Sequence, residues 1–216
     1  MGNTNFLYLL GALLVLLLGT PLAHDLGLGS EPAVRGVLFS VLLLIGVWSL
    51  RGGRRFFMAG MAFVVLGITL NVLAINIESI VFRYCSLLAL LGFLVVAISF
   101  TLRQVIFGTE MNVNRLVGAI CVFLLLGIIW SFAYALLELF APGSFKGFSP
   151  GHGPGEDSSW LYFSFVTLTT LGYGDITPVS AMARSLAFMQ AVAGQFYVAV
   201  LVAGLVSAYI SDRRGS

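Results

Sequence analysis

Charged residues are scarce in this chain of 216 residues, of which only 9% are Asp, Glu, Lys or Arg. Soluble domains contain about 25% charged residues. Hydrophobic residues make up 59% of the sequence, and the mean hydropathy is +1.04. This composition excludes an ordinary soluble domain and predicts a membrane protein.

Cysteine and histidine are also rare, with two residues of each. Cys85 and Cys121 lie in apolar runs, so we expect small core residues rather than a disulfide framework. His24 and His152 lie far apart in polar loops, with no cluster of cysteines or carboxylates beside them, which argues against a metal site. Because neither histidine can face a serine at membrane depth, an intramembrane serine protease is disfavoured, and we expect no enzymatic activity.

Long apolar runs are abundant, and six of them can cross a hydrocarbon core of about 30 Å as helices. They are Phe6–Ala23, Ala33–Leu50, Phe56–Ile75, Ile80–Leu102, Leu116–Ala141 and Ser185–Ile210. The first run lacks the basic flank of a signal peptide, so we interpret it as a membrane span. A seventh run, Trp160–Thr169, is too short to cross and predicts a re-entrant half-helix. The predicted fold is therefore an all-α membrane protein.

Basic residues in short loops indicate the orientation of such a protein, because they favour the cytoplasmic side. One side would carry seven basic residues: Arg51, Arg54, Arg55, Arg103, Arg115, Arg213 and Arg214. The opposite side would carry four basic residues (Arg35, Arg83, Lys146, Arg184) and seven acidic ones (Asp25, Glu31, Glu78, Glu138, Glu156, Asp157, Asp175). We therefore expect a multi-pass protein of the plasma membrane with both termini in the cytoplasm.

The most informative stretch is Thr169–Asp175, which reads Thr-Thr-Leu-Gly-Tyr-Gly-Asp and directly follows the predicted half-helix. Gly172 and Gly174 can adopt positive φ without a Cβ clash, so the backbone can turn its carbonyl oxygens toward one axis. Oxygens held in this way can replace the hydration shell of a cation. The stretch resembles the selectivity filter of potassium channels at every position except Leu171, where valine or isoleucine is usual.

This resemblance implies a potassium-selective pore. The carbonyl oxygens of Thr170, Leu171, Gly172 and Tyr173, together with the Thr170 hydroxyl, would bind K⁺, and Gly174 would complete the ion-binding filter. No organic cofactor is implied. Because the chain has one filter and a single loop cannot surround an ion, four copies would assemble into a homotetramer.

The resemblance to potassium channels also implies residues that support the filter. Thr169, Val166 and Asp175 are the support positions, and Asp175 would stand at an acidic outer mouth. Val166 occupies a place where some channels carry a glutamate that pairs with this aspartate, and Tyr162-Phe163 stand where many carry two tryptophans. The half-helix would be capped by Asp157 or Ser158.

The chain divides into a four-helix unit (1–107), an interfacial linker (108–115) and a pore domain (116–216), the last of which resembles the potassium-channel pore domain. A voltage sensor needs about 3–4 gating charges per subunit. Between Ile80 and Leu102 the only basic residue is Arg83, near one end. We therefore expect a voltage-sensor-like unit without sensor charges and a channel that voltage does not gate by itself.

The last apolar run suggests a gate. Gly194 follows Pro178 by sixteen residues, the spacing of the hinge glycine in the resembling family, and predicts a bend point. Val198, Val202 and Val206 recur every four residues, so on an α-helix they would share a face and could form an apolar constriction.

Two other functions stay open at this stage. A nonselective cation channel usually departs from Gly-Tyr-Gly at the tyrosine, which Tyr173 retains. Potassium-uptake transporter subunits contain four degenerate filter-like repeats in one chain, whereas this sequence has a single intact copy.

Overall fold

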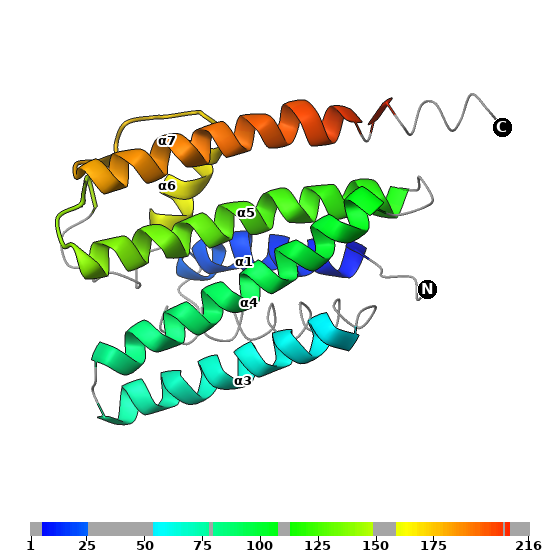
Figure 1. Cartoon of the computed structure of the whole chain (residues 1–216). Coiled ribbons are helices and arrows are strands. Elements are labelled where there is room, and N and C mark those ends of the chain that lie inside the picture. Colours follow the sequence, from blue (N-terminus) through cyan, green and yellow to red (C-terminus); the bar gives the residue numbers. More distant parts are fainter. Residues whose placement is uncertain are drawn as a thin grey trace. The chain divides into compact units, whose positions relative to one another are not determined.

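The computed structural model describes residues 6–25, 54–77, 80–107, 113–148, 159–204 and 206–207, and these residues are mostly helical (Figure 1). The α-helices are α1 (Phe6–Asp25), α3 (Arg54–Ile77), α4 (Ile80–Phe107), α5 (Val113–Phe140), α6 (Ser159–Leu168) and α7 (Ala181–Phe196). A π-helical segment, η2 (Tyr197–Val202), continues α7, and two short strands are β1 (Phe145–Lys146) and β2 (Thr177–Pro178).

The predicted helices agree with these elements where the structure describes them. Four of the long runs coincide with α1, α3, α4 and α5 to within a few residues, and the short run coincides with α6. The run Ala33–Leu50 lies outside the described residues. In the described part, the segments Tyr84–Phe107 and Val113–Phe140 are long and apolar enough to span a membrane. An apolar helical membrane protein is thus supported, and the count of six spans stays a prediction.

The last helix begins earlier than the predicted Ser185 because Ser180 caps it. The Ser180 hydroxyl accepts a hydrogen bond from the Ala183 amide at 3.2 Å. Such a cap satisfies one of the amides that a helix start leaves unpaired.

The chain forms two compact units, residues 1–125 and 126–216, whose boundary falls within α5. Of the predicted linker 108–115, residues 113–115 form the first turn of α5 and the remainder lie outside the described residues. The predicted functional division into 1–107, 108–115 and 116–216 remains a prediction.

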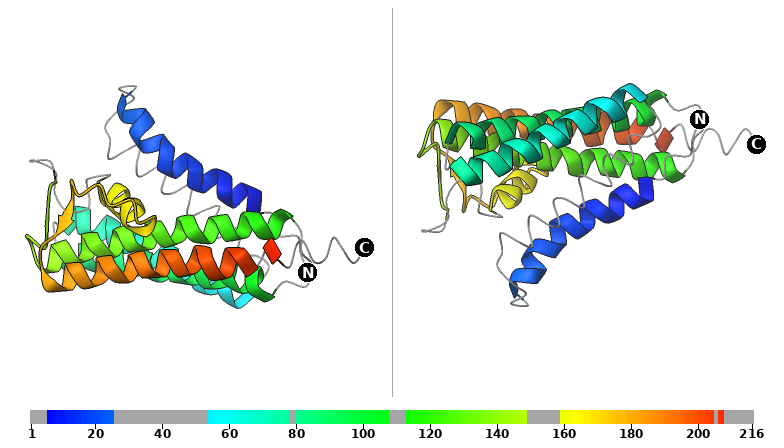
Figure 2. Two further views of the ribbon diagram at one scale, coloured as in Figure 1. Left: turned by 90° about the horizontal axis from the view of Figure 1, so that it is seen from above. Right: turned by 90° about the horizontal axis from the view of Figure 1, so that it is seen from below.

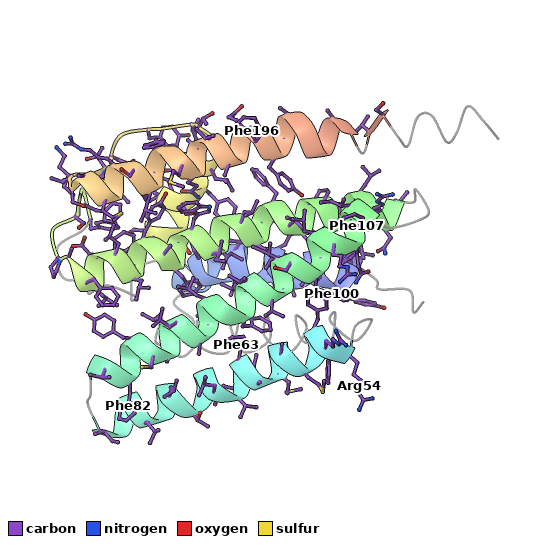
Figure 3. The ribbon with its side chains drawn as sticks, viewed as in Figure 1. Arg54, Phe63, Phe82, Phe100, Phe107 and Phe196 are labelled. Atoms are coloured by element: carbon purple, nitrogen blue, oxygen red, sulfur yellow. The ribbon has the colours of Figure 1, made fainter. Side chains whose placement is uncertain are left out.

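In the first unit, α3 and α4 run side by side in opposite directions (Figure 1). Phe63 of α3 packs on Gly92 of α4, and Phe56 contacts Phe100 with 5.2 Å between ring centroids (Figure 3). The two cysteines are free thiols, as predicted; Cys121 is buried, whereas Cys85 is only half-buried.

The second unit contains the predicted half-helix and filter. In both views of Figure 2, α6 lies at the end of this unit where α5 ends and α7 begins. Aromatic side chains fill the space around α6, with 4.9 Å between the ring centroids of Tyr134 and Phe163 and 5.1 Å between those of Phe145 and Trp160. This aromatic core fixes the helix from which the filter emerges.

Candidate functional site

The backbone of the predicted filter alternates between left-handed and other conformations. Thr170, Gly172 and Gly174 have φ values of +59°, +59° and +81°, whereas Leu171 and Tyr173 lie outside the positive-φ region. A left-handed residue at every second position turns successive carbonyl groups toward the same side, which a uniform strand cannot do. The positive φ expected at the two glycines is confirmed. The positive φ of Thr170 is an additional finding, because a β-branched residue rarely adopts it.

The filter starts as the cap of α6. The Thr170 amide donates to the Thr167 carbonyl at 3.0 Å, and the Leu171 amide donates to the Val166 carbonyl at 2.9 Å. These two bonds form the Schellman motif, in which the residue after the helix is left-handed and is usually glycine. Thr170 takes that place, at a cost of about 1–3 kcal/mol in backbone strain.

Two of the predicted support residues lie at this junction. Val166 is buried, and its carbonyl also accepts from the Gly172 amide at 3.3 Å. The Thr169 hydroxyl donates to the Phe165 carbonyl at 2.7 Å. The end of α6 thus holds the beginning of the predicted filter through backbone carbonyls, and the contact of Val166 does not depend on its side chain.

Asp175, the third predicted support residue, is held by Tyr162. The Tyr162 hydroxyl donates to Asp175 Oδ2 at 2.6 Å, and the Tyr162 ring is parallel to that of Tyr173, with 6.4 Å between centroids. The hydrogen bond from Tyr162 lowers the pKa of Asp175, because it stabilises the carboxylate. The same bond, followed by desolvation, raises the pKa of Tyr162 to about 12. The pair is thus ionised only at Asp175 around neutral pH.

The end of the predicted filter at Asp175 is also tied to the segment after α5. Strand β1 pairs antiparallel with β2, and the Val179 amide donates to the Ser144 carbonyl at 2.7 Å. Gly147 has φ +99°, and a Cβ there would lie 1.9 Å from the Asp175 carbonyl oxygen. Only glycine permits this approach, which places a loop backbone directly behind Asp175.

A buried polar network joins α5, α6 and α7. The Tyr134 hydroxyl donates to Gln190 Oε1, and Gln190 Nε2 donates to the Ser164 carbonyl at 3.0 Å and to Ser164 Oγ at 2.8 Å. Ser164 Oγ in turn donates to the Gly127 carbonyl at 2.6 Å. Tyr134, Ser164 and Gln190 are fully buried, so their polar groups form hydrogen bonds with protein atoms in place of water.

The structure describes the surroundings of three of the four predicted gate residues. Gly194 is buried, and a Cβ there would lie 2.1 Å from the Leu168 carbonyl oxygen, so this glycine brings α7 against the end of α6. Val198 and Val206 are 51% and 42% exposed, and the side chain of Val202 lies outside the described part. Because η2 interrupts the α-helical period, the every-four spacing of the valines does not by itself give one shared face.

Sequence reasoning missed the supporting residues Tyr162, Gln190 and Gln195. Gln195 Nε2 donates to Thr170 Oγ1 at 3.1 Å, which links α7 to the filter. The available signal was the presence of glutamines in an otherwise apolar helix, because a polar side chain at membrane depth needs an internal partner. The half-helix caps Asp157 and Ser158 lie outside the described residues.

Comparison with known proteins shows which family part of this chain resembles. Residues 122–211 match the family model described as ion channel, which covers less than half of the chain. The chain is 39% identical over 71 residues to the two pore potassium channel c of Oryza sativa subsp. japonica and 41% identical over 56 residues to the two-pore potassium channel 3 of Arabidopsis thaliana. These matches cover 33% and 26% of this chain but only 15% and 13% of the relatives, so the chain spans a small part of their length.

No solved structure matches the chain. The ion-channel family is not an enzyme family. The apolar helices of this chain, together with the family match, indicate a membrane protein. The family model and the two relatives together support a potassium-channel family.

Proposed function

We propose that this protein is a potassium-selective channel that conducts K⁺ passively. The observation that carries the proposal is the alternating backbone hand of Thr170, Gly172 and Gly174 directly after a short apolar helix. This backbone offers a row of carbonyl oxygens from Thr170 to Tyr173, and the Thr170 hydroxyl adds a ligand at the end nearest α6. Such oxygens can replace the water around K⁺, and no organic cofactor takes part.

The conducting unit would be a homotetramer. One filter loop provides oxygens on one side of an ion only, so four copies around an axis are needed to enclose it. In the single chain, Leu171 and Tyr173 are 56% and 67% exposed, which leaves the filter side chains to be covered by neighbouring copies. Phe188 of α7 is also exposed and would face lipid or another copy.

The channel would not be gated by voltage alone. Helix α4 contains Arg83 and Arg103, at opposite ends of an otherwise uncharged apolar helix. One charge crossing the whole membrane yields about 2.3 kcal/mol per 100 mV, and residues near the ends cross only part of the field. We place the protein in the plasma membrane with both termini in the cytoplasm, following its basic loops.

Ion flux into liposomes that contain the purified protein tests the proposal. A K⁺ gradient should drive flux, whereas an equal Na⁺ gradient should drive little. The Gly174→Ala substitution forces a side chain into φ +81° and should abolish K⁺ preference. Gly143→Ala is the matched control, because it imposes the same strain at φ +84° away from the filter, and neither position has an atom within 4 Å of the added carbon.

Each alternative predicts a different outcome of this assay. Equal K⁺ and Na⁺ flux would indicate a nonselective cation channel. Flux that requires a second transported ion would indicate a transporter subunit. Equal loss of selectivity in the Gly174→Ala and Gly143→Ala variants would contradict the assignment of the filter.

A further inference from the structure

The first filter residue is held in an unfavourable conformation by contacts beyond its own loop. Thr170 occupies the left-handed position of the helix cap, at φ +59°, where glycine is usual. The two backbone bonds of the cap fix its main chain. They leave its hydroxyl free to rotate, so a further contact is needed to define where the oxygen points.

The hydroxyl has such contacts on two sides. Thr170 Oγ1 donates to the Thr169 carbonyl at 2.7 Å and accepts a hydrogen bond from Gln195 Nε2 at 3.1 Å. A hydroxyl group has one proton and two lone pairs. With the proton directed to Thr169 and one lone pair directed to Gln195, the remaining lone pair is available for a cation.

Gln195 is itself placed by the contacts of α7 with α6. Gly194, the preceding residue, approaches the Leu168 carbonyl so closely that a methyl group would not fit. One turn earlier, Gln190 bonds to Ser164 in the middle of α6. The amide of Gln195 therefore reaches Thr170 from a segment that is anchored at two points.

We propose that Gln195 is a positioning residue that sets the orientation of the Thr170 hydroxyl and so helps to determine selectivity for K⁺. The proposal rests on the channel function proposed above and adds a specificity-determining contact to it. A neutral amide suits this role because it orders the oxygen without placing a charge beside a permeating cation. An unoriented hydroxyl could donate its proton toward the ion instead, which would weaken the site nearest α6.

The test combines substitutions at both ends of the hydrogen bond. Gln195→Met keeps the length of the side chain and removes the donor, and it is combined with Thr170→Ser, which keeps the hydroxyl, and with Thr170→Val, which removes it. Phe196→Met is the matched control, because it introduces the same residue at the next, exposed position. The readouts are the K⁺/Na⁺ flux ratio in liposomes and the K⁺ concentration that half-stabilises the purified protein against heat.

Loss of one neutral hydrogen bond corresponds to a change of about fivefold in an equilibrium. We expect Gln195→Met to lower the flux ratio, and to raise the half-stabilising K⁺ concentration, by about this factor. The same effect should occur in the Thr170→Ser background and be absent in the Thr170→Val background, because interacting residues are not additive. Phe196→Met should leave both quantities unchanged.

Three results would overturn the inference. An unchanged ratio in Gln195→Met would show that the contact does not affect selectivity. An equal loss in the Thr170→Val background would show that Gln195 acts through another group. Loss of the assembled particle in size-exclusion chromatography would identify Gln195 as a packing residue only. By contrast, absence of K⁺-selective flux in the unaltered protein would refute the proposed function, and the inference with it.

Discussion

Substitution of Gly194 by alanine separates two roles of this glycine, close packing and bending. A methyl carbon at this position would lie 2.1 Å from the Leu168 carbonyl oxygen and 3.0 Å from Leu168 Cδ1. The carbonyl is backbone at the end of α6, so it cannot move aside by a rotamer change. Either α7 or the end of α6 must shift, and the filter begins two residues beyond Leu168.

The expected magnitude follows from a comparison with Gly204. Overpacking of a buried site costs about 1–3 kcal/mol. Replacement of a helical glycine by alanine returns about 1 kcal/mol of helix propensity. Gly204 lies two residues beyond the end of η2, in an α-helical turn, and has no atom within 4 Å of an added methyl carbon, so Gly204→Ala gains the propensity without the clash. The two variants should therefore differ in unfolding free energy by about 1–3 kcal/mol, with Gly194→Ala the less stable.

Thermal unfolding of both variants in detergent measures this difference, and liposome flux measures its effect on the filter. A shift of the end of α6 should lower the K⁺/Na⁺ ratio in Gly194→Ala and leave it unchanged in Gly204→Ala. A pure bend point gives another pattern, in which Gly194→Ala is at least as stable as Gly204→Ala and reduces opening without loss of selectivity. That pattern would refute the packing argument.

Two further predictions concern groups that hold the filter. Tyr162→Phe removes the hydrogen bond that lowers the pKa of Asp175, so the carboxylate should be protonated at a higher pH. A carboxyl group whose pKa is lowered in the folded state stabilises the fold at pH values above its ordinary pKa, and this stabilisation is lost as the pH falls. The variant lacks this stabilisation, so its acid unfolding should begin at a higher pH than that of the unaltered protein. In Gln190→Leu, the Tyr134 hydroxyl loses its buried acceptor and Ser164 loses its donor, so the unfolding free energy should fall by about 1–3 kcal/mol per unsatisfied group. Thermal unfolding measures this loss, and a stability equal to that of the unaltered protein would contradict the network.

The helices of this protein were predictable because a membrane restricts the possible structures. A segment that crosses hydrocarbon must satisfy its backbone internally, so a long apolar run forms a helix. This reasoning gave α1, α3, α4 and α5 almost to their ends. The backbone conformation of Gly172 and Gly174 in the predicted filter was predictable for a different reason, since glycine adopts the positive φ values that other residues avoid.

The supporting contacts were less predictable because they join residues that only the folded chain brings together. Tyr162 and Asp175 stand 13 positions apart, and Thr170 and Gln195 stand 25 positions apart. Each pair joins a helix to a residue outside that helix, so no helical or strand period relates its two members. The positive φ of Thr170 was also missed, because the intrinsic preference of threonine opposes it and only the cap of α6 explains it.

The contacts of α7 also change where a bend is expected. Gln190, Gly194 and Gln195 attach this helix to α6 and to the filter, so the segment up to Gln195 is held at three points. The π-helical segment η2 begins two residues later, at Tyr197. Segments of this kind are frequent at functional sites and are a recognised cause of helix kinks. A bend at Gly194 would have to separate α7 from Leu168, whereas a bend within η2 would leave all three contacts intact. A bend within η2 therefore breaks fewer contacts than a bend at Gly194. We expect the helix to bend at η2, where the contacts of α7 with α6 and with the predicted filter are kept.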